Sequence, residues 1–501
     1  MGNYSYDIKQ GKFVSKKQGK RFFQMASNDS FVGWDTQDVS ADASIYPQLV
    51  QMVSRSRDLE RNNDYIVNYL RLLKANVIGP NGIKLTACRK SRNGRVDKTF
   101  NGAVEKAWRM AGKLKHSPSA CGKQTRKDIG DMAMARLAVD GEAIIYHRPG
   151  FRQNKWRYAV QFIDSMRLDW RVNGMLSNGN RGKMGVEVDE DDRPIAYHVL
   201  KAHPSEGLFG WNIRQPEYDR ILAEHITHLY VIERPGQTRG ITWLASSGMR
   251  ARMLDKFEEA VCVGARVAAS KMAFYKPNEE YEGDLPGDED SSANLRQEVE
   301  PGMLELLPRG LDMETFDPNF PPANLEEFHK VISRGIASGV GANYNHVFSN
   351  YEGVNYSSLR EAKLVDRDAW RTLQKFYVEH FEEIWFTRWA EIQQLNADSG
   401  IDAEKLRALI DEDCYRFTAR GWQWVDPLKE VNANIQAIGA GLTSPQRVIE
   451  ETSGEDPAVI LEEIREFNFM AGDDVSLNYQ EPPAPAEAES TKKKDKEDED
   501  E

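Results

Sequence analysis

The sequence predicts a mixed α+β fold that is rich in helix. Three observations lead to this prediction: a strand-like block between Glu142 and Tyr230, long segments of helical spacing on both sides of it, and abundant apolar residues. Apolar residues make up 40% of the 501 residues, which is enough for several hydrophobic cores. A chain of this length usually forms about three folding units, so we expect more than one domain.

The strand prediction rests on short apolar runs of period two that lie between clusters of Gly, Asn, Asp and Pro. The expected strands are Ala143–His147, Tyr158–Ile163, Gly185–Val188, Ile195–Leu200 and Ile226–Val231. The acidic run Asp189–Asp192 precedes Arg193-Pro194 between two of these strands, so it is interpreted as a solvated hairpin tip and not as a magnesium site.

The helix prediction rests on apolar residues that recur every three to four positions. The expected helices are 46–73, 104–110, 126–138, 248–275, 325–340, 358–395, 428–440 and 445–469, with a strand at 415–424. The helix from Ser358 begins with a capping-box pattern, Ser358-Leu359-Arg360-Glu361. Its many aromatic residues predict a core helix; they are Trp370, Phe376, Tyr377, Phe381, Trp385, Phe386 and Trp389.

Small and apolar residues mark two of these helices as contact helices. In the helix at 248–275, Ala260, Gly264 and Ala268 recur at every fourth position and predict a flat ridge that another helix can approach. In the helix at 325–340, Ile332 and Ile336 belong to one apolar face. These five residues are the candidate contacts between subunits.

A polar loop at 343–355 separates two predicted helices. Glycines at 335, 339 and 341 weaken the helix before it, because glycine costs roughly 1 kcal/mol relative to alanine in a helix interior. The candidate functional residues of the loop are Asn345, His346, Ser349, Asn350, Tyr351, Glu352 and Asn355. Most of them can hydrogen-bond or stack transiently, while Glu352 repels phosphate. An ordinary solvent-exposed loop remains the alternative.

Charge and cysteine content limit the classes of protein that fit. The net charge is −12, and residues 480–501 contribute nine acids against four lysines. This balance opposes tight DNA binding, which needs a basic surface, but does not oppose a channel in which DNA slides. The four scattered cysteines indicate free thiols in a reducing compartment. No apolar run is long enough to cross a membrane, and no signal peptide is evident.

Patterns typical of enzymes are absent or incomplete. No Gly-Lys pair is followed by Ser or Thr, which argues against a phosphate-cradling ATPase loop. Gly339-Val340-Gly341 lacks the third glycine of a dinucleotide fingerprint. His225 and His228 precede a strand without an evident third metal ligand. The sequence therefore predicts no catalytic residues, no metal site, no cofactor and no enzymatic activity.

Several segments, taken in order, resemble the lambda-type family of phage portal proteins. These are SRDLERNN at 56–63, NVIG at 76–79, IAYHVLKAHP at 195–204, HITHLYVIERPGQTRGITWLA at 225–245, Leu254–Ala269 and PGMLELLPRGLDMETFDPNFPPANLEEFHKVISRGIASGVG at 301–341. The resemblance spans roughly residues 45 to 470, and its specificity lies in the combination of segments.

This resemblance implies a portal fold with wing, stem, clip and crown regions that assembles as a closed ring, a dodecamer, at one capsid vertex. The implied division is an N-terminal arm (1–45), an α/β wing domain (46–247), a first stem helix (248–276), a clip (277–323), a second stem helix (324–342), a tunnel loop (343–356), a long wing helix with a returning strand (357–427), crown helices (428–472) and a disordered charged tail (473–501).

The resemblance also implies partners. They are double-stranded DNA in non-specific passage, the terminase large subunit, a head–tail connector, and the major capsid and scaffold proteins, with no membrane. The resemblance implies that the candidate residues of the loop at 343–355 contact the passing DNA. The protein would be assembled in the host cytoplasm and located in the virion. A packaging-associated nuclease or ATPase, or a different head–tail adaptor ring, remains the alternative.

Overall fold

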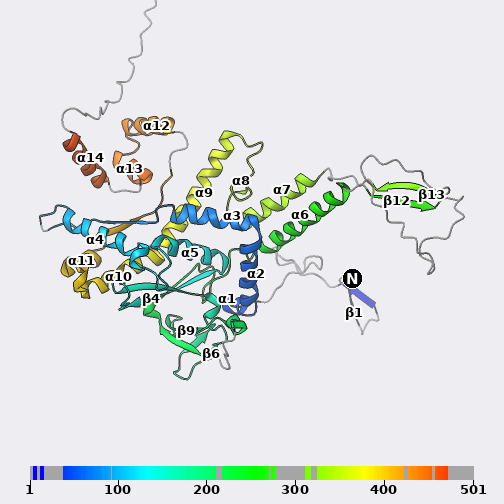
Figure 1. Ribbon diagram of the computed structural model, residues 1–501, viewed down its shortest axis with the longest axis horizontal. Coiled ribbons are helices and arrows are strands. Elements are labelled where there is room, and N and C mark those ends of the chain that lie inside the picture. The colour runs from blue at the N-terminus through cyan, green and yellow to red at the C-terminus, as the bar shows by residue number, and fades with distance from the viewer. Residues whose placement is uncertain are drawn as a thin grey trace, which may run out of the picture.

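The computed structural model describes residues 4–7, 12–15, 38–91, 93–209, 217–269, 272–277, 311–316, 324–422, 427–453 and 457–471. Figure 1 shows a body of helices and sheets from which two helices, α6 (Gly248–Ala269) and α7 (Leu325–Gly339), project side by side. Helices α12–α14 lie on another side of the body (Figure 1). The fold is a helix-rich mixture of α and β structure, as the sequence predicts.

Two antiparallel sheets form part of the body. The three-stranded sheet has the order β11-β4-β5, and the five-stranded sheet has the order β10-β9-β8-β7-β6. Their strands are β4 (Glu142–Pro149), β5 (Tyr158–Ile163), β6 (Gly174–Met175), β7 (Arg181–Lys183), β8 (Val186–Val188), β9 (Pro194–Leu200), β10 (Tyr218–Leu222) and β11 (Ile226–Tyr230). All five predicted strands of this block are present, and Asp189–Asp192 forms the turn between β8 and β9.

Three two-stranded sheets join segments elsewhere in the chain. The strand β14 pairs with β3 across more than 300 residues of sequence, with Tyr415 opposite Ala87. The strands β12 and β13 pair at the far end of the projecting helices (Figure 1), with Met272 opposite Phe316. The bounds are β1 (Tyr4–Asp7), β2 (Lys12–Ser15), β3 (Lys84–Ala87), β12 (Met272–Pro277), β13 (Leu311–Phe316) and β14 (Tyr415–Thr418).

The remaining helices surround and extend the sheets. Those of the body are α1 (Ala41–Ile45), α2 (Leu49–Asn62), α3 (Asp64–Leu73), α4 (Lys98–Ala111), α5 (Arg126–Val139), α9 (Tyr356–Tyr377), α10 (Glu383–Leu395) and α11 (Ala403–Asp411). The others are α8 (Tyr344–Val347), α12 (Pro427–Gly439), α13 (Pro445–Ser453) and α14 (Pro457–Ala471). The π-helical turns Lys74–Ile78 and Val378–Glu382 follow α3 and α9.

The core of the body is centred on aromatic side chains of α4 and α10. The ring of Trp108 meets those of Trp385, Phe386 and Trp389 edge to face at centroid distances of 5.2 to 5.7 Å. All four rings are buried, and such edge-to-face pairs add to the stabilisation from burial alone. The aromatic residues of the predicted core helix are therefore in the core, except that Phe376 is only half-buried.

Several predicted boundaries differ from the structure. The helix predicted at 46–73 is broken at Asn63, whose side chain caps α3 by accepting from the Ile66 amide at 2.9 Å. The helix predicted to reach Tyr275 ends at Ala269, and the chain continues into β12. The helix predicted to start with a Ser358 capping box begins two residues earlier, because Asn355 accepts from the Ser358 amide at 2.8 Å and is the N-cap.

Parts of the expected domain division lie outside the described residues. Of the segment 277–323, the structure describes only Pro277 and the strand β13, and it describes nothing of 473–501. Of the segment 1–45 it describes β1, β2 and residues 38–45, including α1.

Candidate functional site

The segment Arg234–Gly240, which carries much of the family resemblance, forms a buried ion-pair network in the body. The guanidinium of Arg239 donates to Glu142 at 2.5 and 2.9 Å and to the carbonyl oxygens of Ser165 and Met184 at 3.0 and 2.8 Å. His228 Nε2 lies 2.9 Å from the same carboxylate. Burial alone would raise the pKa of Glu142, but Arg239 and His228 outweigh it and hold this pKa at about 2.

Glycines allow the chain to reach this network. Gly141 has a φ of +87°, and a Cβ there would lie 2.3 Å from the carbonyl carbon of Ile241. A Cβ on Gly240 would lie 2.0 Å from the carbonyl oxygen of Gly141. Thr238 donates from its amide and hydroxyl groups to Asp42, both at 2.8 Å. The segment therefore holds α1, β4 and the chain before α6 together, and its role is structural.

His225 and His228, the two histidines with metal-ligand spacing, do not form a catalytic or metal centre. His228 belongs to the ion-pair network, and His225 lies 3.5 Å from Glu224. Among the described residues, no three His, Cys, Asp or Glu side chains are grouped closely enough to hold a metal ion. Within the same part of the chain, no helix is long and apolar enough to cross a membrane.

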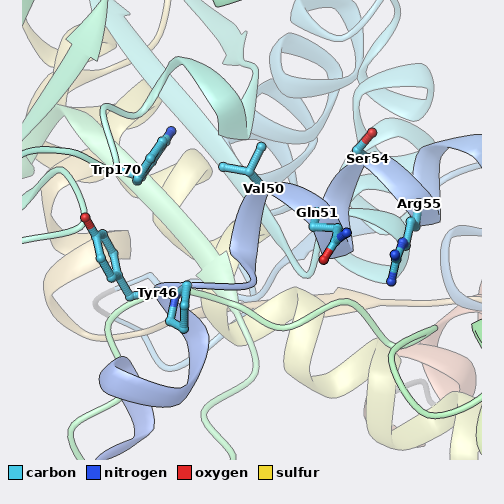
Figure 2. Close-up of a pocket in the computed structure, with 7 residues that line it drawn as sticks. Tyr46, Val50, Gln51, Ser54, Arg55 and Trp170 are labelled. Atoms are coloured by element: carbon cyan, nitrogen blue, oxygen red, sulfur yellow. The ribbon is translucent and has the colours of Figure 1, made fainter.

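An open groove of about 650 Å³ lies between α2, the turn before it and Trp170. Figure 2 shows Tyr46 and Trp170 at one end of it and Arg55 at the other, with Val50 and Gln51 between them. The two aromatic rings are 5.8 Å apart. The lining contains no carboxylate, histidine or cysteine, so it offers no acid–base pair or nucleophile.

The projecting helices α6 and α7 pack closely along their length. The rings of Phe257 and Phe328 meet at 4.9 Å. A Cβ on Gly335 would lie 2.7 Å from Arg250 Nη1, and a Cβ on Gly339 would lie 2.8 Å from Ser247 Cβ. Gly339 therefore allows α7 to approach the chain just before α6 closely, whereas the neighbour of Gly335 is the movable end of the Arg250 side chain.

The outer side of α6 leaves apolar side chains uncovered. Met249 and Met253 are 65% and 66% exposed, and Val263 is 51% exposed. At 100° per residue, these three residues and the exposed Ala260 lie within an arc of about 80°, which also contains Lys256, 58% exposed. On α7, Val331 is 67% exposed. An isolated chain therefore presents a mainly apolar face on α6, interrupted by Lys256, and a further exposed apolar side chain on α7; such surfaces often mark protein interfaces.

Of the five predicted contact residues, only Ala260 lies on this face. Gly264 and Ala268 are half-buried, because every fourth residue advances by about 40° around a helix. Ile332 is half-buried against the main hydrophobic core, and Ile336 is completely buried in it. Ile336 therefore serves the core of its own chain, and we do not retain it as a subunit contact.

A polar cluster ties the base of the helix pair to the body. Tyr65 on α3 donates to Glu258 Oε1 on α6 at 2.6 Å, and His329 Nε2 on α7 lies 2.8 Å from the same oxygen. The Tyr65 ring lies 4.3 Å from that of Phe348, which follows α8. Burial and the Glu258 carboxylate raise the pKa of Tyr65, so its hydroxyl stays a donor. The cluster connects α3, α6, α7 and the loop at 343–355.

The first half of this loop is folded against the body. It forms the short helix α8, and Asn68 on α3 donates to the carbonyl oxygen of His346 at 3.0 Å. The side chain of His346 contacts the carboxylate of Asp366 on α9, which also accepts from the Asn343 amide at 3.2 Å. His346 therefore anchors the loop to α9.

The second half of the loop is the exposed part. Ser349, Tyr351, Glu352 and Asn355 are exposed, whereas Asn345 and Asn350 are half-buried. Ser349 has a φ of +52°, so the chain turns sharply before this tip. The residues predicted to contact DNA are therefore divided between an anchored half and an exposed tip. The anchors Asp366 and Asn68 lie far away in sequence, and no local pattern marks them.

Comparison with known proteins identifies the family. The profile of the phage portal proteins, lambda family, matches residues 27–374. The probable portal protein of Halomonas phage phiHAP-1 is 32% identical over 460 residues, which cover 89% of this chain and 86% of that protein. Portal protein B of Escherichia phage lambda is 21% identical over 473 residues, covering 86% of each chain.

Solved structures give more distant matches. A chain from the neck of an empty GTA particle has a TM-score of 0.42 and 13% identity, with 80% of this chain and 92% of that chain covered. A chain from the neck of a native GTA particle has a TM-score of 0.40 and 14% identity, with 79% and 92% covered. The assignment follows from the profile and the sequence relatives: this chain belongs to the lambda family of phage portal proteins.

Proposed function

We propose that this portal protein forms a closed ring, a dodecamer, at one capsid vertex, and that double-stranded DNA enters and leaves the head through its channel. Portal proteins are structural, and the protein is not an enzyme. The observation that carries the proposal is the uncovered apolar face of α6 and α7, because a helix pair that projects from the body cannot bury this face alone. A cyclic ring buries such a face against the next copy at each interface.

Within this proposal, the body at 46–247 and the long helices α9 and α10 form the wing, and α6 and α7 form the stem. The hairpin of β12 and β13 belongs to a clip that docks the terminase large subunit during packaging and a head–tail connector afterwards. Helices α12–α14 form the crown, and major capsid and scaffold proteins surround the wing. Assembly takes place in the host cytoplasm.

The loop at 343–355 is proposed to line the channel. Its exposed tip carries Tyr351, Glu352 and Asn355, which combine weak polar contacts with one repulsive carboxylate. Such a set favours sliding over capture, because strong phosphate neutralisation would hold DNA in place. The anchored half, through His346 and Asp366, fixes the position of the tip on α9.

Ring formation is tested by light scattering and negative-stain imaging of the purified protein. We expect closed rings without nucleotide, and we expect Ala260→Arg to give mainly unassembled subunits, because it places a charge in the uncovered face. Met175→Arg is the matched control, since Met175 is 72% exposed on a strand of the body. A wild-type protein that stays monomeric at all concentrations and salt levels would refute the ring.

The channel role of the loop is tested by deleting Ser349–Gly353 and measuring ring formation and DNA packaging into proheads. We expect normal rings with impaired packaging or DNA retention. Normal packaging and retention would refute a channel role, and loss of rings would assign the segment to the subunit interface instead.

A further inference from the structure

Two arginines of α9 lie against a single indole ring at the surface of the body. The guanidinium carbons of Arg367 and Arg371 are 6.0 and 5.9 Å from the ring centroid of Trp422, which follows β14. A guanidinium within about 6 Å of an aromatic ring is attracted to the negative face of that ring. This geometry is suited to phosphate recognition, in which arginine can donate two parallel hydrogen bonds.

The Trp422 ring is held in a fixed position. Its Nε1 donates to Asn76 Oδ1 at 3.1 Å, and Gln374 on α9 donates to the carbonyl oxygens of Asn76 and Arg420 at 2.8 and 3.0 Å. Arg420 donates to the carbonyl oxygen of Ala75 at 2.5 Å. These contacts connect three segments far apart in sequence, so the fold fixes the ring beside which Arg367 and Arg371 lie.

The two arginines belong to a longer basic track on α9, formed by Arg360, Lys363, Arg367, Arg371 and Lys375, of which Arg371 and Lys375 are exposed and the other three half-buried. At 100° per residue the five lie within an arc of about 120°, and the track is about 22 Å long. With Arg420 there are six basic residues, against three carboxylates, Glu361, Asp368 and Glu379, on one flank of the track. The track is thus basic on a chain whose net charge is −12.

The acidic residues beside the track pair only weakly with its basic residues. Asp368 lies 3.2 Å from Arg371, and Glu379 lies 3.6 Å from Lys375. In both pairs the two side chains are about half or more exposed, and exposed pairs of this kind contribute roughly 0–1 kcal/mol. A polyanion can therefore replace these carboxylates at little cost.

We propose that the Trp422 cluster and the basic track of α9 bind the phosphate backbone of double-stranded DNA without regard to sequence. Phosphates of one strand advance about 3.4 Å along the duplex axis, so the track spans about six of them. The site is separate from the tip at 349–353 and opposite to it in charge. It rests on the proposed function only in requiring that DNA passes the protein, and it adds a surface that holds DNA beside a loop that lets it slide.

The test is fluorescence anisotropy of the purified full-length protein with labelled 30-bp duplexes of two unrelated sequences, between 50 and 200 mM salt. We expect equal affinity for both sequences and a log–log salt dependence whose slope falls by about 2 in Arg371→Gln/Lys375→Gln, because each lost phosphate contact removes about 0.9. Affinity at low salt should fall about tenfold in this variant. Trp422→Phe, which retains an aromatic ring but loses the hydrogen bond to Asn76, should give a smaller loss.

Lys201→Gln/Arg407→Gln is the matched control. It removes the same two charges from exposed pairs with Glu217 and Asp411, away from α9. An equal loss in this control would assign the effect to net charge and overturn the site, as would a wild-type protein that does not bind the duplexes at 50 mM salt. A peptide of residues 480–501 tests whether the track binds an acidic protein segment instead of DNA. If the peptide binds the track and the duplexes do not, the proposal is wrong.

Short duplexes report binding whether or not rings form. Failure of the ring proposal would appear by imaging with DNA binding intact, and failure of the DNA site would appear as lost or non-specific binding by intact rings. Thermal unfolding of each variant, followed by circular dichroism, shows that a loss of binding does not come from a loss of fold.

Discussion

The body and the projecting helix pair differ in how their side chains are covered within one chain. In the body, two buried carboxylates find partners within the same chain: Arg239 donates to Glu142, and Glu187 accepts from Arg220 and two asparagines. Along α6 and α7, apolar side chains such as Met253 and Val331 are left uncovered. The body also exposes apolar side chains, such as Met175 and Leu395, but on α6 several of them lie on one side of the helix, so we propose that the helix pair contacts another surface.

The same contrast explains why family resemblance and function lie in different places. The segment Arg234–Gly240 is easily recognised in the sequence, yet it acts inside the fold. The surfaces that we propose for assembly and DNA passage lie on α6, α7 and the loop at 343–355. In a structural protein of this kind, we expect the functional residues to lie on exposed surfaces and not in the recognisable buried segments.

The largest expected effect is on the buried ion pair of the body. Arg239→Met leaves the Glu142 carboxylate buried without its main partner, which should lower the free energy of unfolding by about 3–5 kcal/mol. Denaturant unfolding measures the loss. Glu142→Leu/Arg239→Met removes both charges and should recover a large part of it. A loss below about 1 kcal/mol in the single variant would mean that water replaces the arginine.

The next effect concerns Glu382, which is buried in the π-helical turn after α9. Burial raises the pKa of this carboxyl to about 7, while Arg126 only partly offsets the shift. Its pKa is therefore higher in the folded than in the unfolded chain. As the pH rises from about 4 to 7, the unfolded chain loses its proton first, so stability falls by about 3 kcal/mol through this group.

Glu382→Gln removes this dependence. We expect the melting temperature of the variant to exceed that of the wild type at pH 8 and to approach it at pH 5. Glu379→Gln is the matched control, because Glu379 is exposed in the same turn. An unchanged pH profile in Glu382→Gln would show that this carboxylate is not neutral in the fold.

A smaller effect is expected where the loop is anchored to the body. Asp366→Asn weakens the contact with His346 and should cost about 1–2 kcal/mol, as a charged hydrogen bond does. Amide hydrogen exchange should become faster in 343–348 and remain unchanged in α4. Asp368→Asn, two residues away and exposed, should leave exchange unchanged. Equal protection in both variants would mean that Asn68 alone holds the loop.

Sequence periodicity predicted the elements of the fold well where packing follows local spacing. The five strands between 142 and 230, α5 and α7 lie within a residue or two of their predicted ranges. Breaks set by a single side chain were missed: Asn63 divides a predicted helix because its side chain satisfies the first amides of α3. The short strands β6, β7 and β10 were also missed, since they are too brief and too exposed to show alternation.

The candidate sites were predicted less completely. The loop at 343–355 was found from its glycines and polar residues, but its anchors, Asp366 and Asn68, depend on tertiary contacts. The stem ridge was placed by counting every fourth residue, which drifts around the helix and mixes exposed with half-buried positions. The basic track of α9 was not found, because Trp422 and Arg420 join it only through folding.

The smallest expected effect is that of Val331→Ser, and the same kind of substitution in the body, Val104→Ser, serves as its comparison. Val104 is completely buried in the body, and Val331 is 67% exposed on α7. Val104→Ser removes buried methyl groups and buries a hydroxyl, so it should cost about 2–4 kcal/mol. Val331→Ser should change the free energy of unfolding of the single chain by less than about 0.5 kcal/mol, because its side chain is already in water.

Val331→Ser should instead weaken assembly, because in the proposed ring this side chain is covered by the next copy. Unfolding is measured at concentrations where the wild type is monomeric, and assembly by light scattering at higher concentration. If Val331→Ser destabilises the monomer as much as Val104→Ser, the helix pair is part of the body's core and the contrast between the regions fails. If it leaves assembly unchanged, the apolar contact between copies lies on α6 alone, where Met249, Met253 and Val263 remain.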